Sequence, residues 1–194
     1  MIQGLYKIFD HWHQQGTVWL YSDTHFNEDE DLRKPFPGRP SAEEQIKMIN
    51  SKVGRKDTLI LLGDVGDPEV AKKLRGYKIL ICGNHDVGAS NYADIFDEIY
   101  TGPLMISEKI ILSHEPLDID WAFNIHGHTH CIEKDRKGHM CVCSDFIKYT
   151  PVNFNQFVKS GRLKEIETLH RSTIDTATER KAKRIARQER KSFS

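Results

Sequence analysis

The sequence predicts an α/β fold in which layered β-sheets form a sandwich flanked by helices. Short apolar segments recur along the chain and end at Asp, Asn or Ser-His, which is typical of buried strands. Polar segments with helix-capping residues lie between these segments. This alternation of strands and helices indicates an α/β architecture.

The composition is that of an ordinary globular protein. The chain has 194 residues, of which 38% are hydrophobic and 29% are charged, which excludes a disordered or collagen-like chain. The 28 basic residues balance the 28 acidic ones, so overall charge does not favour nucleic acid or anionic membranes as partners. Without an apolar stretch of roughly 18 residues or a signal-peptide pattern, we expect no membrane partner and a cytoplasmic location. The four cysteines do not form a disulfide framework, and we expect reduced thiols.

The order of elements follows from apolar segments and caps. The predicted strands are 17–22, 58–62, 78–82, 110–112, 121–125 and 140–143. Ser41 and Glu44 form an S-x-x-E capping box for a helix that continues through Val53. Asp67-Pro68 predicts a second helix that runs to about Leu74. A third helix is expected over 152–159, and the polar, proline-containing segment 24–40 is a long loop.

The last part of the chain differs in charge from the rest. We divide the chain into a domain over 1–170 and a basic helix or tail over 171–194, which holds eight basic and three acidic residues. The segment 174–191 favours a solvated helix, polar on all sides. An alternative is that its basic stripe docks nucleic acid or an acidic protein.

Residues with metal-binding chemistry follow the apolar segments. They occur in Asp23-Thr24-His25, Gly63-Asp64, Gly83-Asn84-His85-Asp86, Ser113-His114 and Gly127-His128-Thr129-His130. Taken singly, each motif is typical of a turn, a cap or a surface histidine. Their ordered conjunction instead indicates one metal cluster, since the outer residues of D-x-H and H-x-H project to the same side of an extended strand or of its exit. Oxygen and imidazole ligands without thiolate suit Mn²⁺, iron, Zn²⁺ or Ni²⁺.

The order of these motifs over 21–130 resembles that of the calcineurin-like metallophosphoesterases. Within that superfamily the chain looks most like the small bacterial and phage-type predicted phosphoesterases. The shared motifs are D-T-H-F at Asp23, Arg39-Pro40, S-H-E-P at Ser113 and H-G-H-T-H at His126. The chain departs from that subgroup at Asn27-Glu28, where such proteins often carry another histidine.

The resemblance implies two metal sites that share one carboxylate. One would be formed by Asp23, His25, Asp64 and His130, and the other by Asp64, Asn84, His114 and His128. It implies two divalent ions, with Mn²⁺ preferred over iron, Zn²⁺ or Ni²⁺, and hydrolysis of a phosphoester by a metal-bridging hydroxide. We expect small phosphodiesters, nucleotides or short nucleic-acid ends as substrates. The alternatives are a phosphatase acting on small molecules or phosphoproteins, and a non-catalytic metal-binding scaffold with a docking tail.

The resemblance also implies residues that act on the substrate. His85 would stabilise the transferring phosphoryl group or protonate the leaving oxygen. Asp86 would orient the His85 ring, with capping of a loop as the alternative. Asn84 and Arg39 are the remaining candidates for contact with the substrate.

Overall fold

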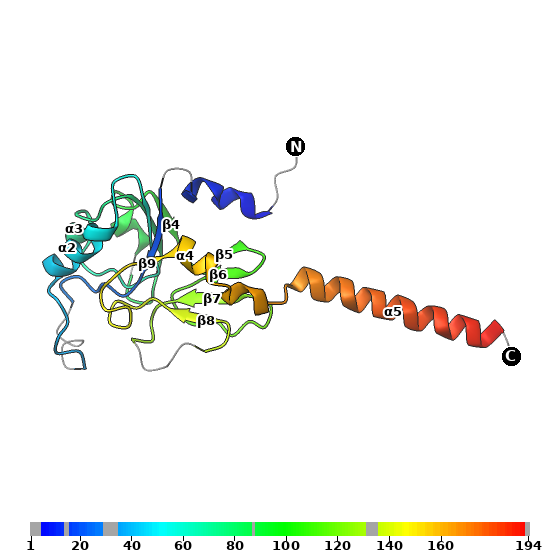
Figure 1. Cartoon of the computed structure of the whole chain (residues 1–194). Coiled ribbons are helices and arrows are strands. Elements are labelled where there is room, and N and C mark those ends of the chain that lie inside the picture. Colours follow the sequence, from blue (N-terminus) through cyan, green and yellow to red (C-terminus); the bar gives the residue numbers. More distant parts are fainter. Residues whose placement is uncertain (1–4, 14–15, 29–34, 87, 131–135, 193–194) are drawn as a thin grey trace.

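The fold is α/β, with two mixed sheets flanked by helices (Figure 1). The computed structural model describes residues 5–13, 16–28, 35–86, 88–130 and 136–192. The five-stranded sheet contains β4 (Glu98–Tyr100), β3 (Tyr77–Ile81), β2 (Thr58–Leu61), β1 (Val18–Tyr21) and β9 (Val152–Asn153), in that order. The four-stranded sheet contains β5 (Leu104–Ser107), β6 (Ile110–Leu112), β7 (Phe123–His126) and β8 (His139–Cys141).

Most neighbouring strands run parallel. In the first sheet β1 to β4 are parallel, and only β9 is antiparallel to its neighbour. In the second sheet β6, β7 and β8 are parallel, while β5 is antiparallel to β6. The carboxyl ends of the parallel strands in each sheet therefore meet at one edge. A parallel bridge between Ser22 and Cys143 joins the two sheets just beyond β1 and β8.

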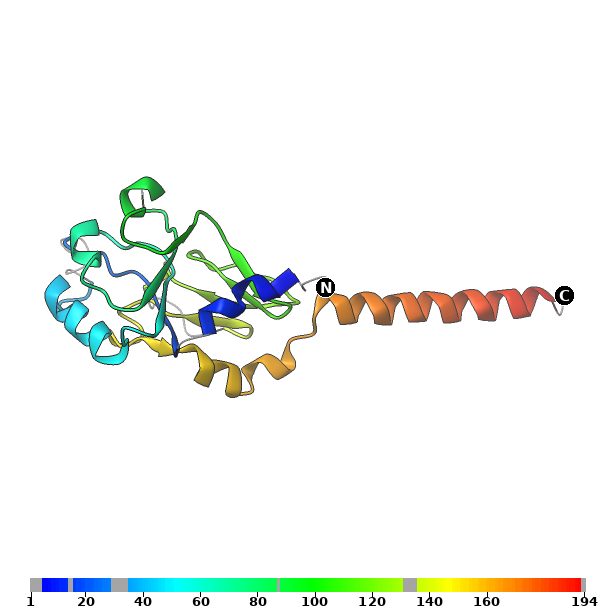
Figure 2. The same cartoon turned by 90° about the horizontal axis from the view of Figure 1, so that it is seen from above.

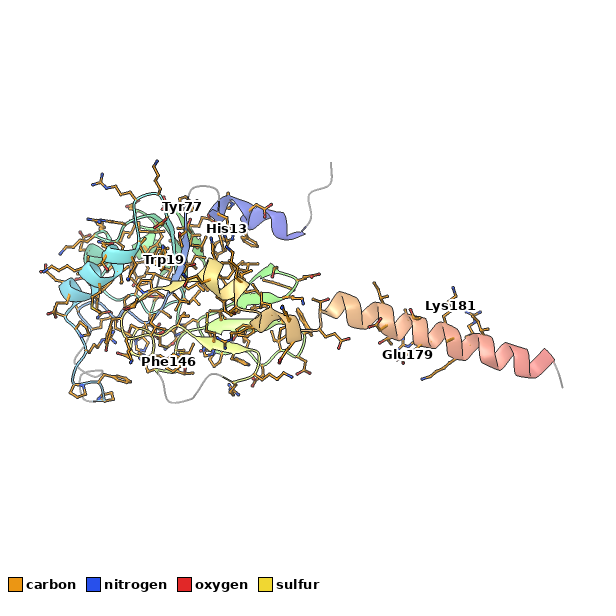
Figure 3. All side chains as sticks on the ribbon, viewed as in Figure 1. His13, Trp19, Tyr77, Phe146, Glu179 and Lys181 are labelled. Atoms are coloured by element: carbon orange, nitrogen blue, oxygen red, sulfur yellow. The ribbon has the colours of Figure 1, made fainter. Side chains whose placement is uncertain are left out.

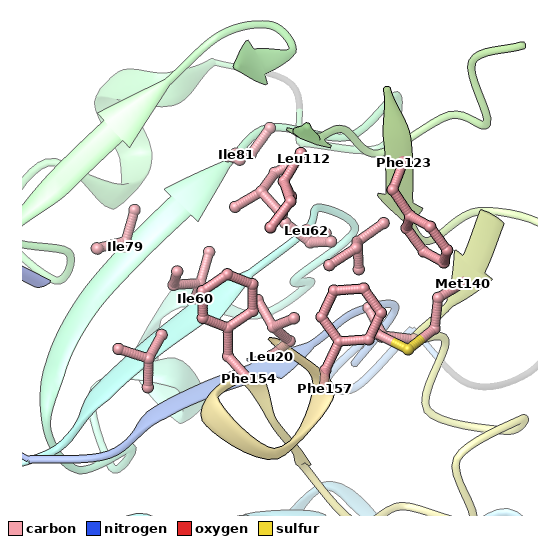
Figure 4. Close-up of a cluster of buried hydrophobic side chains, with 14 of the residues drawn as sticks. Leu20, Ile60, Leu62, Ile79, Ile81, Leu112, Phe123, Met140, Phe154 and Phe157 are labelled. Carbon is pink, nitrogen blue, oxygen red and sulfur yellow. The ribbon is translucent and has the colours of Figure 1, made fainter. Parts of the chain in front are cut away.

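The core has two parts, one on each face of the first sheet. Ile60 and Leu62 point toward the second sheet and pack between the two sheets with Phe123, Met140 and other apolar side chains (Figure 4). The alternate residues Leu59 and Leu61 point to the opposite face. There they pack against α2 (Ala42–Lys52) and α3 (Pro68–Ala71). Because both faces are buried, β2 continues from Thr58 with the apolar residues Leu59, Ile60 and Leu61 in succession.

The helix boundaries follow the predicted caps. Ser41 accepts a hydrogen bond from the Glu44 N–H, and the Glu44 carboxylate accepts one from the Ser41 N–H, which confirms the capping box. The second helix, α3, is shorter than predicted. Its continuation changes to i→i+3 bonds at Lys73 and Leu74, which tighten the chain before it turns at Gly76.

The C-terminal part begins with α4 (Phe154–Lys159) and the 3₁₀ helix η3 (Arg162–Glu165) and ends with the long helix α5 (Leu169–Ser192). Helix α5 extends away from the sheets, whereas the 3₁₀ helix η1 (Leu5–His13) lies against the body (Figures 1 and 2). The predicted terminal helix is confirmed, although it begins five residues earlier than 174. The side chains of Glu179 and Lys181 stand clear of the body (Figure 3).

No helix in the described part of the chain has the length and apolar character required to cross a bilayer.

Candidate metal centre

The predicted ligands converge where parallel strands end. Asp23, Asp64 and Asn84 follow β1, β2 and β3 in the first sheet, while His114 and His128 follow β6 and β7 in the second. The Ser144 N–H donates to the Ser22 carbonyl at 2.9 Å, which holds the two sheets together at this edge. Side chains from both sheets therefore surround one site.

The first cluster contains Asp23, His25 and His130. The ligand atoms of these three residues all lie within 4.8 Å of one another. Asp23 Oδ1 lies 3.5 Å from His130 Nε2 and 4.0 Å from His25 Nε2. The Asp23 and His25 side chains are buried, and His130 is half-buried. This group offers one carboxylate oxygen and two imidazole nitrogens to a cation.

The second cluster contains Asp64, His114 and His128, whose ligand atoms also lie within 4.8 Å of one another. Asn84 Oδ1 joins them, 2.8 Å from His114 Nε2 and 3.0 Å from His128 Nδ1. The two imidazole nitrogens are 3.1 Å apart. The Asn84 oxygen and the two rings therefore approach a common point.

The Asp64 carboxylate lies between the two clusters. Its Oδ2 is 3.6 Å from His25 Nε2 and 3.3 Å from His114 Nε2. Its other oxygen, Oδ1, accepts the His85 N–H at 2.9 Å. That hydrogen bond fixes the orientation of the carboxylate and leaves Oδ2 to face both clusters.

The hydrogen-bonding pattern fits a metal site. His114 Nδ1 lies 2.8 Å from the Leu62 carbonyl, which can only accept, so Nδ1 donates and the neutral ring carries its lone pair on Nε2. That lone pair faces the acceptor oxygens of Asn84 and Asp64. His25 Nε2 is buried and has no hydrogen-bond partner among the described residues. Buried lone pairs that face one another are unfavourable without a proton or a cation between them, and these residues therefore fit two divalent ions.

The electrostatics of the site agree with this fit. Burial opposes a positive charge on His114, but its hydrogen bond to Asp64 and the charges of Asp23 and Asp64 raise its pKa to about 9. Burial also opposes ionisation of Asp64, yet His114 and the His85 N–H lower the pKa of Asp64 to about 2. A proton therefore compensates the carboxylates in the metal-free protein. The same negative field would favour a metal cation.

The backbone brings the ligands together in a different way from the predicted one. Asp23, His25, Asp64, His128 and His130 all have positive φ, between 39° and 69°. The D-x-H and H-x-H residues therefore converge through left-handed turns, and the prediction of alternation along an extended chain is wrong here. Such conformations cost of order 1–3 kcal/mol each and persist where the surrounding structure enforces them.

Two glycines allow the close packing around these turns. A methyl group at Gly83 would collide with Asp64 Oδ1, and one at Gly127 would collide with Ser22 Oγ. Glycine at these positions therefore lets the backbone approach the site closely.

Asp86 does not orient the His85 ring as predicted. Its carboxylate accepts hydrogen bonds from the N–H groups of Asp64, Val65 and Gly83 at 2.7–2.9 Å. Among the described residues, no hydrogen bond joins it to the His85 imidazole. The alternative interpretation, a loop cap, describes it better, because Asp86 ties the loop after β3 to the loop after β2 that carries Asp64.

Arg39 also differs from its predicted role as a substrate contact. Its side chain is fully buried, and its Nη1 lies 2.7 Å from Asp145 Oδ1. Its Nη2 donates to the carbonyl oxygens of Asp23 and Thr24 at 3.0 and 2.7 Å. With its guanidinium occupied in this way, Arg39 braces the turn that carries Asp23.

Asp145 is a site residue that the sequence analysis missed. Its Oδ2 lies 2.8 Å from His130 Nδ1, and its Oδ1 accepts a hydrogen bond from the Tyr149 hydroxyl at 2.6 Å. With Nδ1 donating to Asp145, His130 presents the lone pair of Nε2 to the first cluster. One signal was available, since Ser144-Asp145 follows a predicted strand just as Ser22-Asp23 does.

Comparisons with known proteins support the fold. A scan against protein-family models finds no match, and a search of curated proteins finds none either. Among solved structures, the chain is similar to AQ665 from Aquifex aeolicus, a protein of unknown function, with a TM-score of 0.63 and 24% identity. That alignment covers 74% of this chain and 98% of AQ665. Nuclease MPE from Pseudomonas putida aligns with a TM-score of 0.44 and 21% identity, over 58% of this chain and 61% of the nuclease.

Replacing the carboxylate between the clusters should affect both metals. We expect Asp64→Asn to lower occupancy at both clusters, because it removes a negative charge whose Oδ2 faces both. The protein would be chelated, reloaded with Mn²⁺ and passed through gel filtration, and elemental analysis would then give the number of Mn²⁺ ions bound per chain. Asp94→Asn, an exposed site away from the cluster, is the matched control. Two full equivalents bound to Asp64→Asn would contradict the bridging position.

Removing the charge behind His130 should weaken only the first cluster. We expect Asp145→Asn to lower metal affinity there by about 10- to 100-fold, because the imidazole loses the carboxylate that fixes its tautomer and increases its basicity. A Mn²⁺ titration by calorimetry should show one weakened and one unchanged binding event, with Asp94→Asn again unchanged. Equal weakening of both events would point to a general loss of structure instead.

Proposed function

We propose that this protein is a metal-dependent phosphoester hydrolase. The observation that carries the proposal is the Asp64 carboxylate between two sets of imidazole and oxygen ligands. Pairs of cation sites that share a ligand are typical of enzymes that hydrolyse phosphate esters. The fold alone does not specify a reaction, so the argument rests on the side chains of the site.

The proposed ligands are those described above. Asp23, His25, Asp64 and His130 would hold one ion, and Asp64, Asn84, His114 and His128 would hold the other. Mn²⁺ is the preferred ion, with iron, Zn²⁺ and Ni²⁺ as alternatives that suit the same ligands. When bound, two such cations lower the pKa of water and neutralise the negative charge of a phosphate ester.

His85 is the residue placed to act on the substrate. It is exposed beside the ligands, with its ring centroid 5.2 Å from that of His25. In the proposed hydrolysis, oxygen from water bonds to phosphorus and the water releases a proton to solvent. The bond from phosphorus to the leaving oxygen breaks, and His85 supplies the proton that this oxygen takes and regains one from solvent. A Glu28 carboxylate oxygen lies within 4.8 Å of a nitrogen of its imidazole.

The substrates we propose are small phosphodiesters, nucleotides or short nucleic-acid ends. A phosphomonoesterase is the first alternative, because the same metal ligands serve both reactions. A non-catalytic metal-binding scaffold is the second. In it, the basic helix α5 would dock nucleic acid or an acidic protein through side chains such as Lys181 and Arg184, which are exposed.

A parallel assay of two esters tests the proposal. The protein would be chelated, reloaded with Mn²⁺ and given bis-p-nitrophenyl phosphate and p-nitrophenyl phosphate in separate reactions. We expect turnover of the diester that disappears on chelation and returns with metal. Turnover of the monoester alone would favour a phosphatase. If the metal-loaded protein hydrolyses neither ester, the hydrolase proposal is overturned and the scaffold is favoured.

Removing the His85 ring should separate catalysis from metal binding. We expect His85→Ala to retain both metals and to lose about 10²- to 10⁴-fold in turnover, the usual contribution of a positioned acid. The loss should be larger for an alkyl leaving group than for p-nitrophenolate, which needs less help from a proton donor. The control is His13→Ala, which removes a ring that stacks on Phe154 outside the ligand clusters. An unchanged rate for His85→Ala would show that another group protonates the leaving oxygen.

A further inference from the structure

A cavity of about 220 Å³ adjoins the second ligand cluster. We propose that it binds an uncharged, compact organic substituent of the phosphate ester, a specificity that rests on the proposed function. Its wall is formed by the loop after β3, the turn between β4 and β5, and the loop after β6. We refer to it below as the substituent cavity.

The position of the substituent cavity follows from two of its lining residues. Asn84 and His114 belong both to its wall and to the second cluster, where Asn84 Oδ1 and His114 Nε2 are 2.8 Å apart. A phosphate group held at that cluster would therefore direct one of its substituents into the cavity.

The walls of the substituent cavity favour a neutral group. Cys82, Pro103 and Leu117 supply apolar surface, and no Lys or Arg is among the described residues that line it. Among the described residues of the wall, the one carboxylate is that of Glu115, which is exposed and carries the same sign as a phosphate. A second phosphate or a nucleic-acid backbone would meet repulsion from Glu115 without a Lys or Arg side chain to compensate it.

The size of the cavity limits the substituent to a compact group. Its volume of about 220 Å³ is smaller than the roughly 300–1,000 Å³ of pockets that enclose drug-sized ligands. A single ring or a sugar is therefore a better match than an extended chain.

The wall formed by the loop after β6 is held by a buried amide. Asn124 is 1% exposed. Its Oδ1 accepts the Leu117 N–H at 2.8 Å, and its Nδ2 donates to Ser113 Oγ at 2.8 Å. The Ser113 hydroxyl in turn donates to the Glu115 carbonyl at 2.6 Å. The loop is thus shaped before any ligand arrives, which reduces the entropic cost of binding.

Binding of non-hydrolysable phosphonates to the Mn²⁺-loaded protein tests this inference without turnover. The probes are methylphosphonate, phenylphosphonate and 4-carboxyphenylphosphonate, titrated by calorimetry. We expect phenylphosphonate to bind at least about 10-fold more tightly than methylphosphonate, because its ring buries apolar area in the cavity. The carboxylated probe should bind about fivefold more weakly than phenylphosphonate, since its carboxylate approaches Glu115.

Two variants assign these effects to the cavity. Leu117→Trp should abolish the preference for phenyl over methyl by filling the cavity. Leu117→Ala, which enlarges the cavity, should also change this preference, and it serves as the second variant if the larger residue disturbs folding. Glu115→Gln should reduce the penalty on the carboxylate. The matched controls are Val158→Trp and Glu108→Gln, both at exposed positions outside this cavity.

The outcomes separate the inference from the proposed function. Equal affinity for methyl and phenyl probes in the wild type, or a preference that both Leu117 variants leave unchanged, would overturn the substituent cavity alone. Tighter binding of the carboxylated probe would overturn its neutral character. A clear preference for phenyl in a protein that hydrolyses no ester would overturn the proposed reaction and leave the binding site supported.

Discussion

The structure of the site depends on a carboxylate that must be negative and buried at once. Asp64 Oδ2 faces imidazole nitrogens of His25 and His114 at 3.6 and 3.3 Å. Removing such a charge from water is costly unless positive charge or hydrogen bonds compensate it. The metal-free protein achieves this with a proton on His114, whose pKa is raised to about 9. Two divalent cations would compensate the same charge and satisfy the remaining lone pairs.

The surroundings of the ligands consist largely of groups that hold the backbone. Asp86 and Arg39 bond to N–H and carbonyl groups of the turns that carry Asp64 and Asp23. These turns have positive φ, so without such braces they would relax toward ordinary conformations. The buried polar residues near the site therefore hold the strained turns in place, and this keeps the candidate ligands at fixed separations. Placement at the ends of parallel strands provides the common edge on which this framework is built.

The fold and the convergence of the candidate ligands could be predicted largely from local patterns. Apolar segments and the Ser41 capping box depend on neighbours in sequence, and the structure confirms them. The interactions behind the ligands could not be predicted in this way. Arg39 and Asp145 are 106 positions apart, and their pairing depends on how the two sheets meet. The predicted contact between Asp86 and the His85 ring rested on their adjacency in sequence, whereas the turn directs the Asp86 carboxylate toward the backbone of another loop.

The distribution of positive charge bears on specificity. Near the proposed metals the one described arginine that reaches the ligand turns, Arg39, is buried against Asp145, and the substituent cavity has no Lys or Arg in its described wall. The basic side chains of α5, among them Lys181 and Arg184, lie instead on a helix that extends away from the sheets. The metals would therefore be the main attraction for a phosphate at the site. If α5 binds nucleic acid, it would increase affinity at a distance, and the choice of ester would still depend on what fits beside Asn84.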